Sequence, residues 1–241
     1  MSDQASSHQA IPAMIWASGI IALGLIIGGF LLGDGLKRAR MADRAVTVRG
    51  LAERDVSADL ATWTIGYAAQ GKELSNVQAE VDQDTRTLMD FFKSQGFTDA
   101  DIAMAGVNVN QWFDSNRGVN NITVRQKLQL RTRDIAKARQ AFSRQFELVR
   151  NGVAIEEGSG MVFSFTRLNE IKPMMIAEAT RDARKGAEQF AQDSGTSVGS
   201  IRQATQGYFS IGPRDGNSTG NGSDSPLQKV RVVTTIDFYL D

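Results

Sequence analysis

Residues 11–33 read IPAMIWASGIIALGLIIGGFLLG, 23 positions without one charged side chain. An α-helix rises about 1.5 Å per residue, so a helix of this length covers the roughly 30 Å hydrocarbon core of a bilayer. Residues 1–10 contain no Lys or Arg, whereas a cleavable signal peptide starts with a positive segment and has an apolar core of about 7–15 residues. The stretch therefore predicts an uncleaved transmembrane helix, in contact with membrane lipid, that follows a short tail at residues 1–10.

Glycines in this stretch are spaced four apart, Gly24 with Gly28 and Gly29 with Gly33. Such spacing lets two helix backbones approach closely in lipid, where small residues drive association. Glycine is also common in membrane helices in general. The pattern fits helix association and ordinary glycine usage equally.

A basic connector follows the predicted membrane helix. Residues 34–44, DGLKRARMADR, carry Lys37, Arg38, Arg40 and Arg44, and nothing basic precedes the apolar stretch. The positive-inside rule, taken alone, leaves the C-terminal part of the chain in the cytoplasm.

The rest of the chain is polar and nearly neutral. Of the 27 basic and 27 acidic residues, residues 1–33 hold only one, Asp3, which leaves 27 basic and 26 acidic residues. A nucleic-acid partner requires a concentrated cationic surface, so this balance argues against one. The chain has no cysteine, which excludes disulfides, thiol catalysis and Cys-ligated metals.

Hydrophobic periodicity divides residues 45–241 into helices and strands. Apolar residues three, four and seven apart predict helices at 74–95, 134–150 and 173–194. Alternating apolar residues predict strands at 45–50, 55–69, 102–113, 122–131, 161–167, 199–211 and 229–240. The apolar side changes between Leu60 and Trp63, which predicts a β-bulge near residues 61–62.

Helix ends carry their own signals. Gly96 and Gly195 are expected to end the first and third helices as C-caps, and Pro173 is expected in the first turn of the third helix, where a missing N–H costs nothing. In that helix, alanine recurs every four residues at Ala179, Ala183, Ala187 and Ala191. Small residues on a buried face allow a helix to lie close to a sheet.

Helix, glycine, strand, polar turn and strand occur in this order around Gly96 and again around Gly195. Each predicted strand pair has one apolar and one polar face, a pattern typical of antiparallel sheets with helices on one face. The expected fold is therefore α+β, with a duplicated helix–hairpin unit and one preceding transmembrane helix.

Two segments resemble the SIMPL-domain (DUF541) family. The first is VTVRG at residues 46–50, followed by Glu53, Val56 and Asp59. The second is the alanine-rich helix at 177–191, which runs into Gly195, Val198, Gly199 and Ile201. The resemblance covers about residues 45–240, and a membrane-anchored start before VTVRGLAERDV is similar to a bacterial subset of the family.

The resemblance implies an α+β domain at residues 45–241 that lies outside the cytoplasmic membrane, serves stress defence and self-assembles into homo-oligomers. No catalytic residues are established for the family. This implied periplasmic location opposes the orientation that the basic connector indicates. We expect the periplasmic one, because it rests on the whole domain, and keep the cytoplasmic one as the alternative.

A search for reactive groups finds little. The only histidine, His8, precedes the folded domain, which excludes a Ser–His–Asp triad there. Gly158-Ser159-Gly160 is not a nucleophile elbow, and no phosphate-binding glycine motif has the required strand-to-helix context. Asp99 and Asp101 fit a capping turn that begins at Thr98 better than a metal site. No catalytic residue and no cofactor is expected.

The best metal candidate is the segment Asp215 to Asn221, DGNSTGN, with oxygen-bearing side chains at alternate positions. Pro226 stands where an EF-hand needs its bidentate Glu. We therefore expect residues 212–226 to be a Gly/Ser/Asn loop, without a metal.

Two pairs of adjacent aromatic residues are candidate interface residues. Trp112 and Phe113 lie beside a predicted hairpin tip, and Tyr208 and Phe209 precede the 212–226 loop. Aromatic residues dominate contact energies at interfaces. One member of each pair is expected to point away from the core.

The sequence thus predicts a single-pass protein of the bacterial inner membrane that acts by binding and assembly. Two other functions stay open. The protein could form a ring or pore in the envelope, or it could be an enzyme that uses only carboxylates and lysine.

Overall fold

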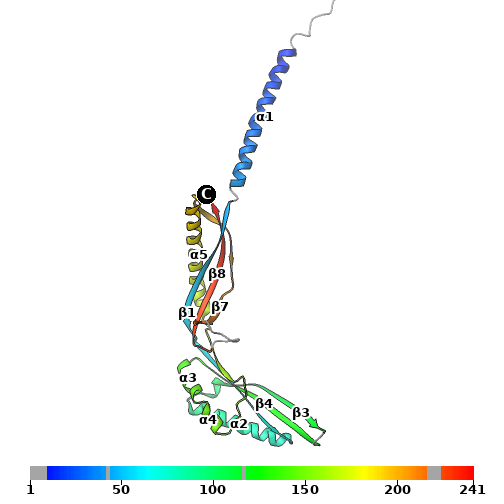
Figure 1. Ribbon diagram of the computed structural model, residues 1–241, viewed down its shortest axis with the longest axis vertical. Coiled ribbons are helices and arrows are strands. Elements are labelled where there is room, and N and C mark those ends of the chain that lie inside the picture. The colour runs from blue at the N-terminus through cyan, green and yellow to red at the C-terminus, as the bar shows by residue number, and fades with distance from the viewer. Residues whose placement is uncertain (1–9, 42–43, 116–117, 216–223) are drawn as a thin grey trace, which may run out of the picture. The chain divides into compact units, whose positions relative to one another are not determined.

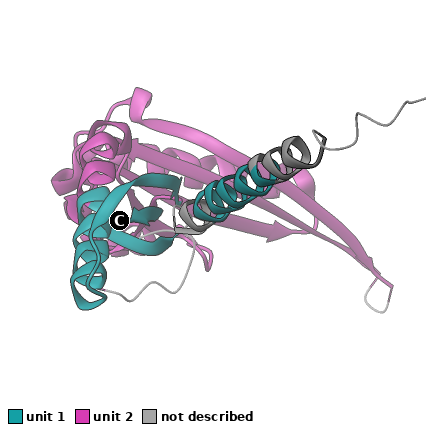
Figure 2. Cartoon of the chain, turned by 90° about the horizontal axis from the view of Figure 1, so that it is seen from above, with its two compact units in different colours: residues 1–51, 179–207, 234–241 teal, residues 52–178, 208–233 magenta. Residues whose placement is uncertain are grey.

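The computed structural model describes residues 10–41, 44–115, 118–215 and 224–241, with only the backbone described at 10–18, 20 and 37–41. The chain forms two compact units, residues 1–51, 179–207 and 234–241 in one and residues 52–178 and 208–233 in the other (Figure 2). The fold is α+β with antiparallel sheets, as the sequence predicts.

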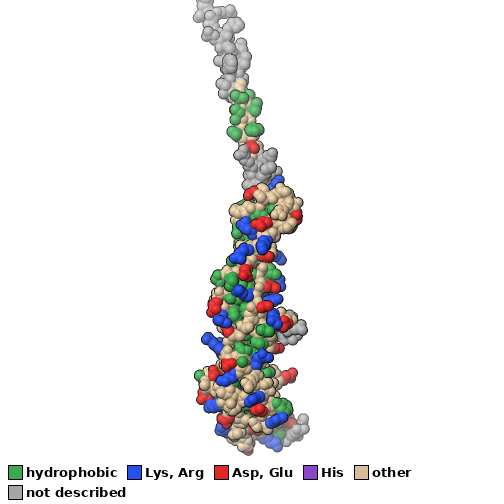
Figure 3. Space-filling view, turned by 90° about the vertical axis from the view of Figure 1, so that its left-hand side faces the viewer, with side chains coloured by type: hydrophobic (Ala, Val, Ile, Leu, Met, Phe, Trp, Pro, Cys, Tyr) green, Lys and Arg blue, Asp and Glu red, His purple; other side chains and the backbone are tan. Residues whose placement is uncertain are grey.

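Helix α1 (Ala10–Met41) contains the predicted membrane stretch (Figure 1). Its large apolar side chains are exposed from Ile21 onward, as Figure 3 shows in green. Among the side chains that are described, no helix combines the length and the apolar character needed to cross a membrane. Residues 11–18 and 20 of the predicted span lie outside those described side chains.

The larger core belongs to a four-stranded sheet of order β3-β4-β2-β5. Its strands are β2 (Leu60–Gly71), β3 (Ile102–Asp114), β4 (Val119–Thr132) and β5 (Gly160–Ser164). Helix α2 (Leu74–Ser94) packs on β2 and β4, the two central strands. Trp63 on β2 makes edge-to-face contacts with Phe92 and Phe142, with ring centroids 5.3 and 5.1 Å apart. Alternating residues of β2 and β4 and the buried faces of the helices and of β5 supply the rest of this core.

Helix α2 ends as predicted. Gly96 has a φ of +83°, a conformation that side chains other than glycine disfavour. The N–H of Gly96 donates to the carbonyl of Lys93 and that of Phe97 donates to the carbonyl of Phe92, the Schellman pattern. The Phe97 ring then packs on Phe92. A short 3-10 helix, η1 (Asp99–Asp101), follows with the predicted capping turn, because Asp101 accepts from the Thr98 N–H and hydroxyl.

The predicted helix at 134–150 is two helices. These are α3 (Ile135–Ser143) and α4 (Phe146–Arg150). The interruption rotates the second helix, so Leu148 is buried while Phe146 and Val149 are exposed. Gly152, with a φ of +94°, follows the second helix.

The second sheet has β8 (Leu227–Leu240) at its centre. Strand β1 (Ala45–Ser57) lies on one side of it, and β6 (Val198–Gln206) and β7 (Ser210–Pro213) pair with it on the other. β1 and β8 are antiparallel, since the Leu240 N–H donates to Arg44 O at 3.0 Å and the Ala58 N–H donates to Pro226 O at 2.7 Å. The strand predicted at 199–211 is therefore β6 and β7, with a break between them.

The predicted β-bulge at 61–62 is wrong. β2 keeps a continuous register with both β4 and β5 through Ala61–Thr64. The change of apolar side occurs at residues 58–59, where the Ala58 N–H bonds to Pro226 O and the Asp59 N–H bonds to Ser164 O. The chain leaves one sheet there and enters the other.

Helix α5 (Leu168–Asp193) begins earlier than predicted. Pro173 lies inside the helix, so the intrahelical bond that its N–H would donate is missing. Ala179, Ala183 and Ala187 are fully buried, as predicted. Gly195, with a φ of +68°, follows the helix, and the Thr196 N–H donates to Ala191 O as in a glycine C-cap.

Gly50 does not close the first strand, because β1 continues through it. A Cβ at this position would lie 1.9 Å from the carbonyl oxygen of Ala179 and 2.5 Å from the backbone nitrogen of Ala183. Gly50 thus allows the alanine face of α5 to lie directly on β1.

Gly50→Ala tests this close contact. We expect the substitution to lower the free energy of unfolding by about 3 kcal/mol, the cost of overpacking a closely packed site. Gly160→Ala in β5 is the control, because an added Cβ there meets nothing within 4 Å. Urea denaturation measures both variants. A Gly50→Ala protein as stable as the control would contradict the contact.

Candidate interaction surface

Strand β3 is at the edge of its sheet, and within the described chain it pairs only with β4. Met104 opposes Leu128 and Val109 opposes Val124, so these β3 side chains point to the face that carries α2. Leu128 and Val124 are buried, but Met104, Val107, Val109 and Phe113 are 49–68% exposed. Helix α2 packs on β2 and β4, and these side chains of β3 stay exposed.

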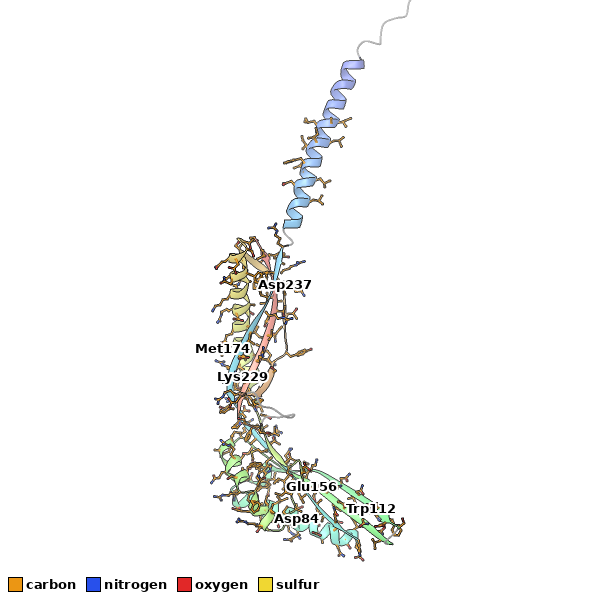
Figure 4. All side chains as sticks on the ribbon, viewed as in Figure 1. Asp84, Trp112, Glu156, Met174, Lys229 and Asp237 are labelled. Atoms are coloured by element: carbon orange, nitrogen blue, oxygen red, sulfur yellow. The ribbon has the colours of Figure 1, made fainter. Side chains whose placement is uncertain are left out.

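The opposite face of β3 is polar except for Trp112. Asn108, Asn110 and Trp112 oppose Arg125, Thr123 and Asn121 of β4. Trp112 lies at the hairpin end of β3 (Figure 4) and is 54% exposed. Trp112 thus points away from the core, as expected for one residue of this pair, but Phe113 on the other face is exposed as well. Both rings are exposed, one on each face.

The second aromatic pair lies between β6 and β7, in the other sheet. Tyr208 is fully exposed, whereas Phe209 is partly covered and lies 5.8 Å from the Lys172 ammonium group, in cation–π geometry. Here one residue of the pair points outward, as expected. The two aromatic pairs therefore belong to different sheets.

The glycines proposed for helix association are open on α1. A Cβ built at Gly24, Gly28, Gly29 or Gly33 meets no described atom within 4 Å. These positions leave the helix backbone accessible to another helix. Nothing in the described chain tests whether one packs there.

A polar cavity of about 600 Å³ is lined by Leu60, Asp101, Arg131, Thr132, Arg133, Asp134 and Thr166. Its carboxylates already have structural roles. Asp101 caps η1, and hydrogen bonds from Thr98 lower the pKa of Asp101. Asp134 accepts the Lys137 N–H at 2.9 Å as the N-cap of α3. The remaining charged groups of the lining, Arg131 and Arg133, are exposed.

Asp59 joins the start of β2 to the segment between β5 and α5. Its carboxylate accepts from the Thr166 N–H at 2.7 Å, the Thr166 hydroxyl at 3.1 Å and Arg167 Nε at 3.0 Å. Burial raises the pKa of Asp59, but these hydrogen bonds and the Arg167 charge outweigh burial, so the pKa lies below its ordinary value. Reasoning from the sequence missed this role, because the partners are 107 and 108 residues away.

Among the described side chains, Asp84 and Tyr67 have a raised pKa. Burial, and next the Glu80 carboxylate, raise the pKa of Asp84 on α2 (Figure 4). Burial also raises the pKa of Tyr67, whose hydroxyl lies 2.7 Å from Thr85 Oγ1. Neither residue lines the polar cavity.

The described residues contain no group of three His, Cys, Asp or Glu side chains that could hold a metal ion. Of the calcium candidate, Asp215 forms an ion pair with Arg214 at 3.1 Å, and residues 216–221 lie outside the described chain. Basic and acidic side chains are intermixed on the face drawn in Figure 3, consistent with the near-zero net charge.

Asp59→Asn tests the carboxylate contacts. We expect it to lower the free energy of unfolding by about 2 kcal/mol at neutral pH, because hydrogen bonds to a charged group contribute about 1.5–3 kcal/mol. A carboxyl group whose pKa is lower in the folded state stabilises above its unfolded pKa and loses this effect as the pH falls through the folded pKa. The difference from the wild type should therefore shrink below about pH 4.

Asp55→Asn is the control for this experiment, since Asp55 is an exposed carboxylate on β1. Denaturation at a series of pH values measures all three proteins. If wild type and Asp59→Asn differ as much at about pH 3 as at neutral pH, the role assigned to the carboxylate charge is wrong.

Two tryptophans, the buried Trp63 and the exposed Trp112, test the exposure of the side chains on β3. Trp63→Ala should lower the free energy of unfolding by about 4 kcal/mol, because Trp63 is in the core. Trp112→Ala should change it by less than about 0.5 kcal/mol at low protein concentration. Circular dichroism during denaturation measures both. A large loss for Trp112→Ala would mean that this ring stabilises the isolated fold.

Comparison with known proteins identifies the family. A search of curated proteins finds no match. A family model described as SIMPL, "Protein of unknown function (DUF541)", matches residues 46–238. The match includes both segments that carry the sequence resemblance, and it extends over most of the chain. The protein therefore belongs to the SIMPL (DUF541) family.

Proposed function

We propose that this protein is a membrane-anchored member of the SIMPL family that acts by binding and self-assembly, without catalysis, in the bacterial cell envelope. Its role there is in stress defence, including defence against oxidative stress. One observation carries the proposal: large apolar side chains on α1 and on β3 have no cover within the described chain.

The apolar side chains of α1 support the membrane anchor. Within residues 11–33, eight of them are 51–74% exposed, namely Ile21, Leu23, Leu25, Ile26, Ile27, Phe30, Leu31 and Leu32. Full burial of one such side chain contributes about 1.5–3 kcal/mol. Lipid around residues 11–33 would supply this burial, and no charged side chain in that stretch opposes it.

The orientation of the anchor rests on two opposing arguments. Family membership favours a C-terminal domain in the periplasm, where the resemblance places SIMPL proteins. The basic residues of the connector, residues 34–44, favour the cytoplasm. We propose the periplasmic location, because the family match covers residues 46–238 and the charge argument rests on a few side chains.

Binding accounts for the site geometry better than catalysis does. The carboxylates of Asp59, Asp101 and Asp134 accept hydrogen bonds that hold the fold together. The enzyme alternative would use carboxylates and lysine, and among these the raised pKa of Asp84 suits a general acid or base. The ring or pore alternative would use the open glycine positions of α1, Gly24 and Gly28.

A reporter fused after Asp241 tests anchor and orientation together. We expect an alkaline phosphatase fusion, which is active only outside the cytoplasm, to be active and to sediment with membranes. The matched control lacks residues 1–33 and should be inactive and soluble. A silent phosphatase fusion together with an active cytoplasmic reporter would overturn the proposed location. A full-length fusion that stays soluble would overturn the anchor.

A further inference from the structure

One sheet edge of this protein has little of the usual protection against strand pairing. We call Ile102–Phe113 of β3 the β3 edge. Its sequence, IAMAGVNVNQWF, has no charged residue and no proline. On the side away from β4, the described chain provides no partner strand for its backbone N–H and C=O groups.

The other outer strands are protected. β1 carries Arg49, Glu53, Arg54 and Asp55, while β7 has four residues and ends at Pro213. β5 has five residues, and the register of β6 is interrupted twice. Short length, charge, proline and irregularity are the devices that prevent edge-to-edge pairing. The β3 edge has one bulge, between Met104 and Gly106, and is regular from there to Asp114.

A second copy of the same strand is the partner that fits this edge. In an antiparallel pair related by a two-fold axis, like residues face each other near the centre, so a charge there would repel its own copy. The β3 edge has none. It also has a mainly apolar row, Val107, Val109, Gln111 and Phe113, on one face and Asn108, Asn110 and Trp112 on the other. Pairing about the two-fold axis places the apolar rows of both copies on the same face.

We propose that two copies of this chain pair antiparallel through their β3 edges, which joins their four-stranded sheets into one continuous sheet. The regular part of the strand runs from Gly106 to Asp114, and its midpoint is Asn110. A register centred on Asn110 places Phe113 opposite Val107 and Trp112 opposite Asn108 of the other copy. This inference rests on the proposed function and names the surface through which assembly occurs.

The cysteine-free chain allows a direct test. We expect full-length protein with Asn110→Cys, in native membranes under mild oxidation, to form a disulfide-linked dimer, seen on a non-reducing gel. Paired residues in an antiparallel sheet have Cα atoms about 4.5–5.5 Å apart, which suits a disulfide. Thr123→Cys is the control, because Thr123 opposes Asn110 on the same face but lies on the internal strand β4.

A charge at the centre of the strand gives the second measurement. Val109→Lys combined with Asn110→Cys should lower the yield of dimer about tenfold, because the two lysines would lie diagonally across the pair, on the same face and next to the two-fold axis, and repel each other. Gln203→Lys combined with Asn110→Cys should leave the yield unchanged, since Gln203 is exposed on β6 of the other sheet. Circular dichroism checks that all variants are folded.

The outcomes separate the β3 pairing from the proposed function. Oligomers seen by size, but without a disulfide-linked dimer of the Asn110→Cys variant, would overturn the β3 pairing and leave assembly standing. A monomer by size with no cross-link would overturn both. Equal cross-linking at positions 110 and 123 would indicate random collision, and cross-linking of position 110 to a protein of another mass would indicate a different partner strand. Either result overturns pairing between two copies.

Discussion

The width of one helix sets the limits of both cores. A helix with its side chains is about 10–12 Å across and strands in a sheet lie about 4.8 Å apart, so one helix covers about two strands. α2 packs on β2 and β4, and the alanines of α5 lie against Val46 and Val48 of β1 and Ile236 and Phe238 of β8. In each sheet the next strand, β3 or β6, is left exposed. The interaction surface follows from this geometry.

Local signals in the sequence predict the elements whose pattern is decided within a few residues. The apolar stripe of α2, the glycine ends at Gly96 and Gly195 and the alternation of β8 are of this kind. The transition from β1 to β2 is not decided by a local pattern. A change of apolar side has the same sequence pattern whether the chain bulges within one sheet or moves to another. Only the backbone bonds of Ala58 and Asp59 to different strands distinguish the two cases.

The surface was partly predictable from the sequence. The aromatic pair Trp112–Phe113 was identified by composition, but its exposure on both faces depends on which strands α2 covers. That coverage is a tertiary property. The uncharged run at residues 102–113 is visible in the sequence, yet the same run would be an ordinary feature of a central strand. It becomes a candidate interaction surface because β3 is at an edge.

A membrane anchor and a strand edge would act together in assembly. A single strand pair buries less surface than the roughly 1,200–2,000 Å² of a stable protein interface. Copies held in one membrane meet at a much higher effective concentration than free copies do, which makes a weak contact sufficient. The balance of 27 basic and 27 acidic residues also keeps repulsion between copies low. A membrane tether would thus supply the local concentration that an uncharged edge strand requires, and the strand would supply the direction of pairing.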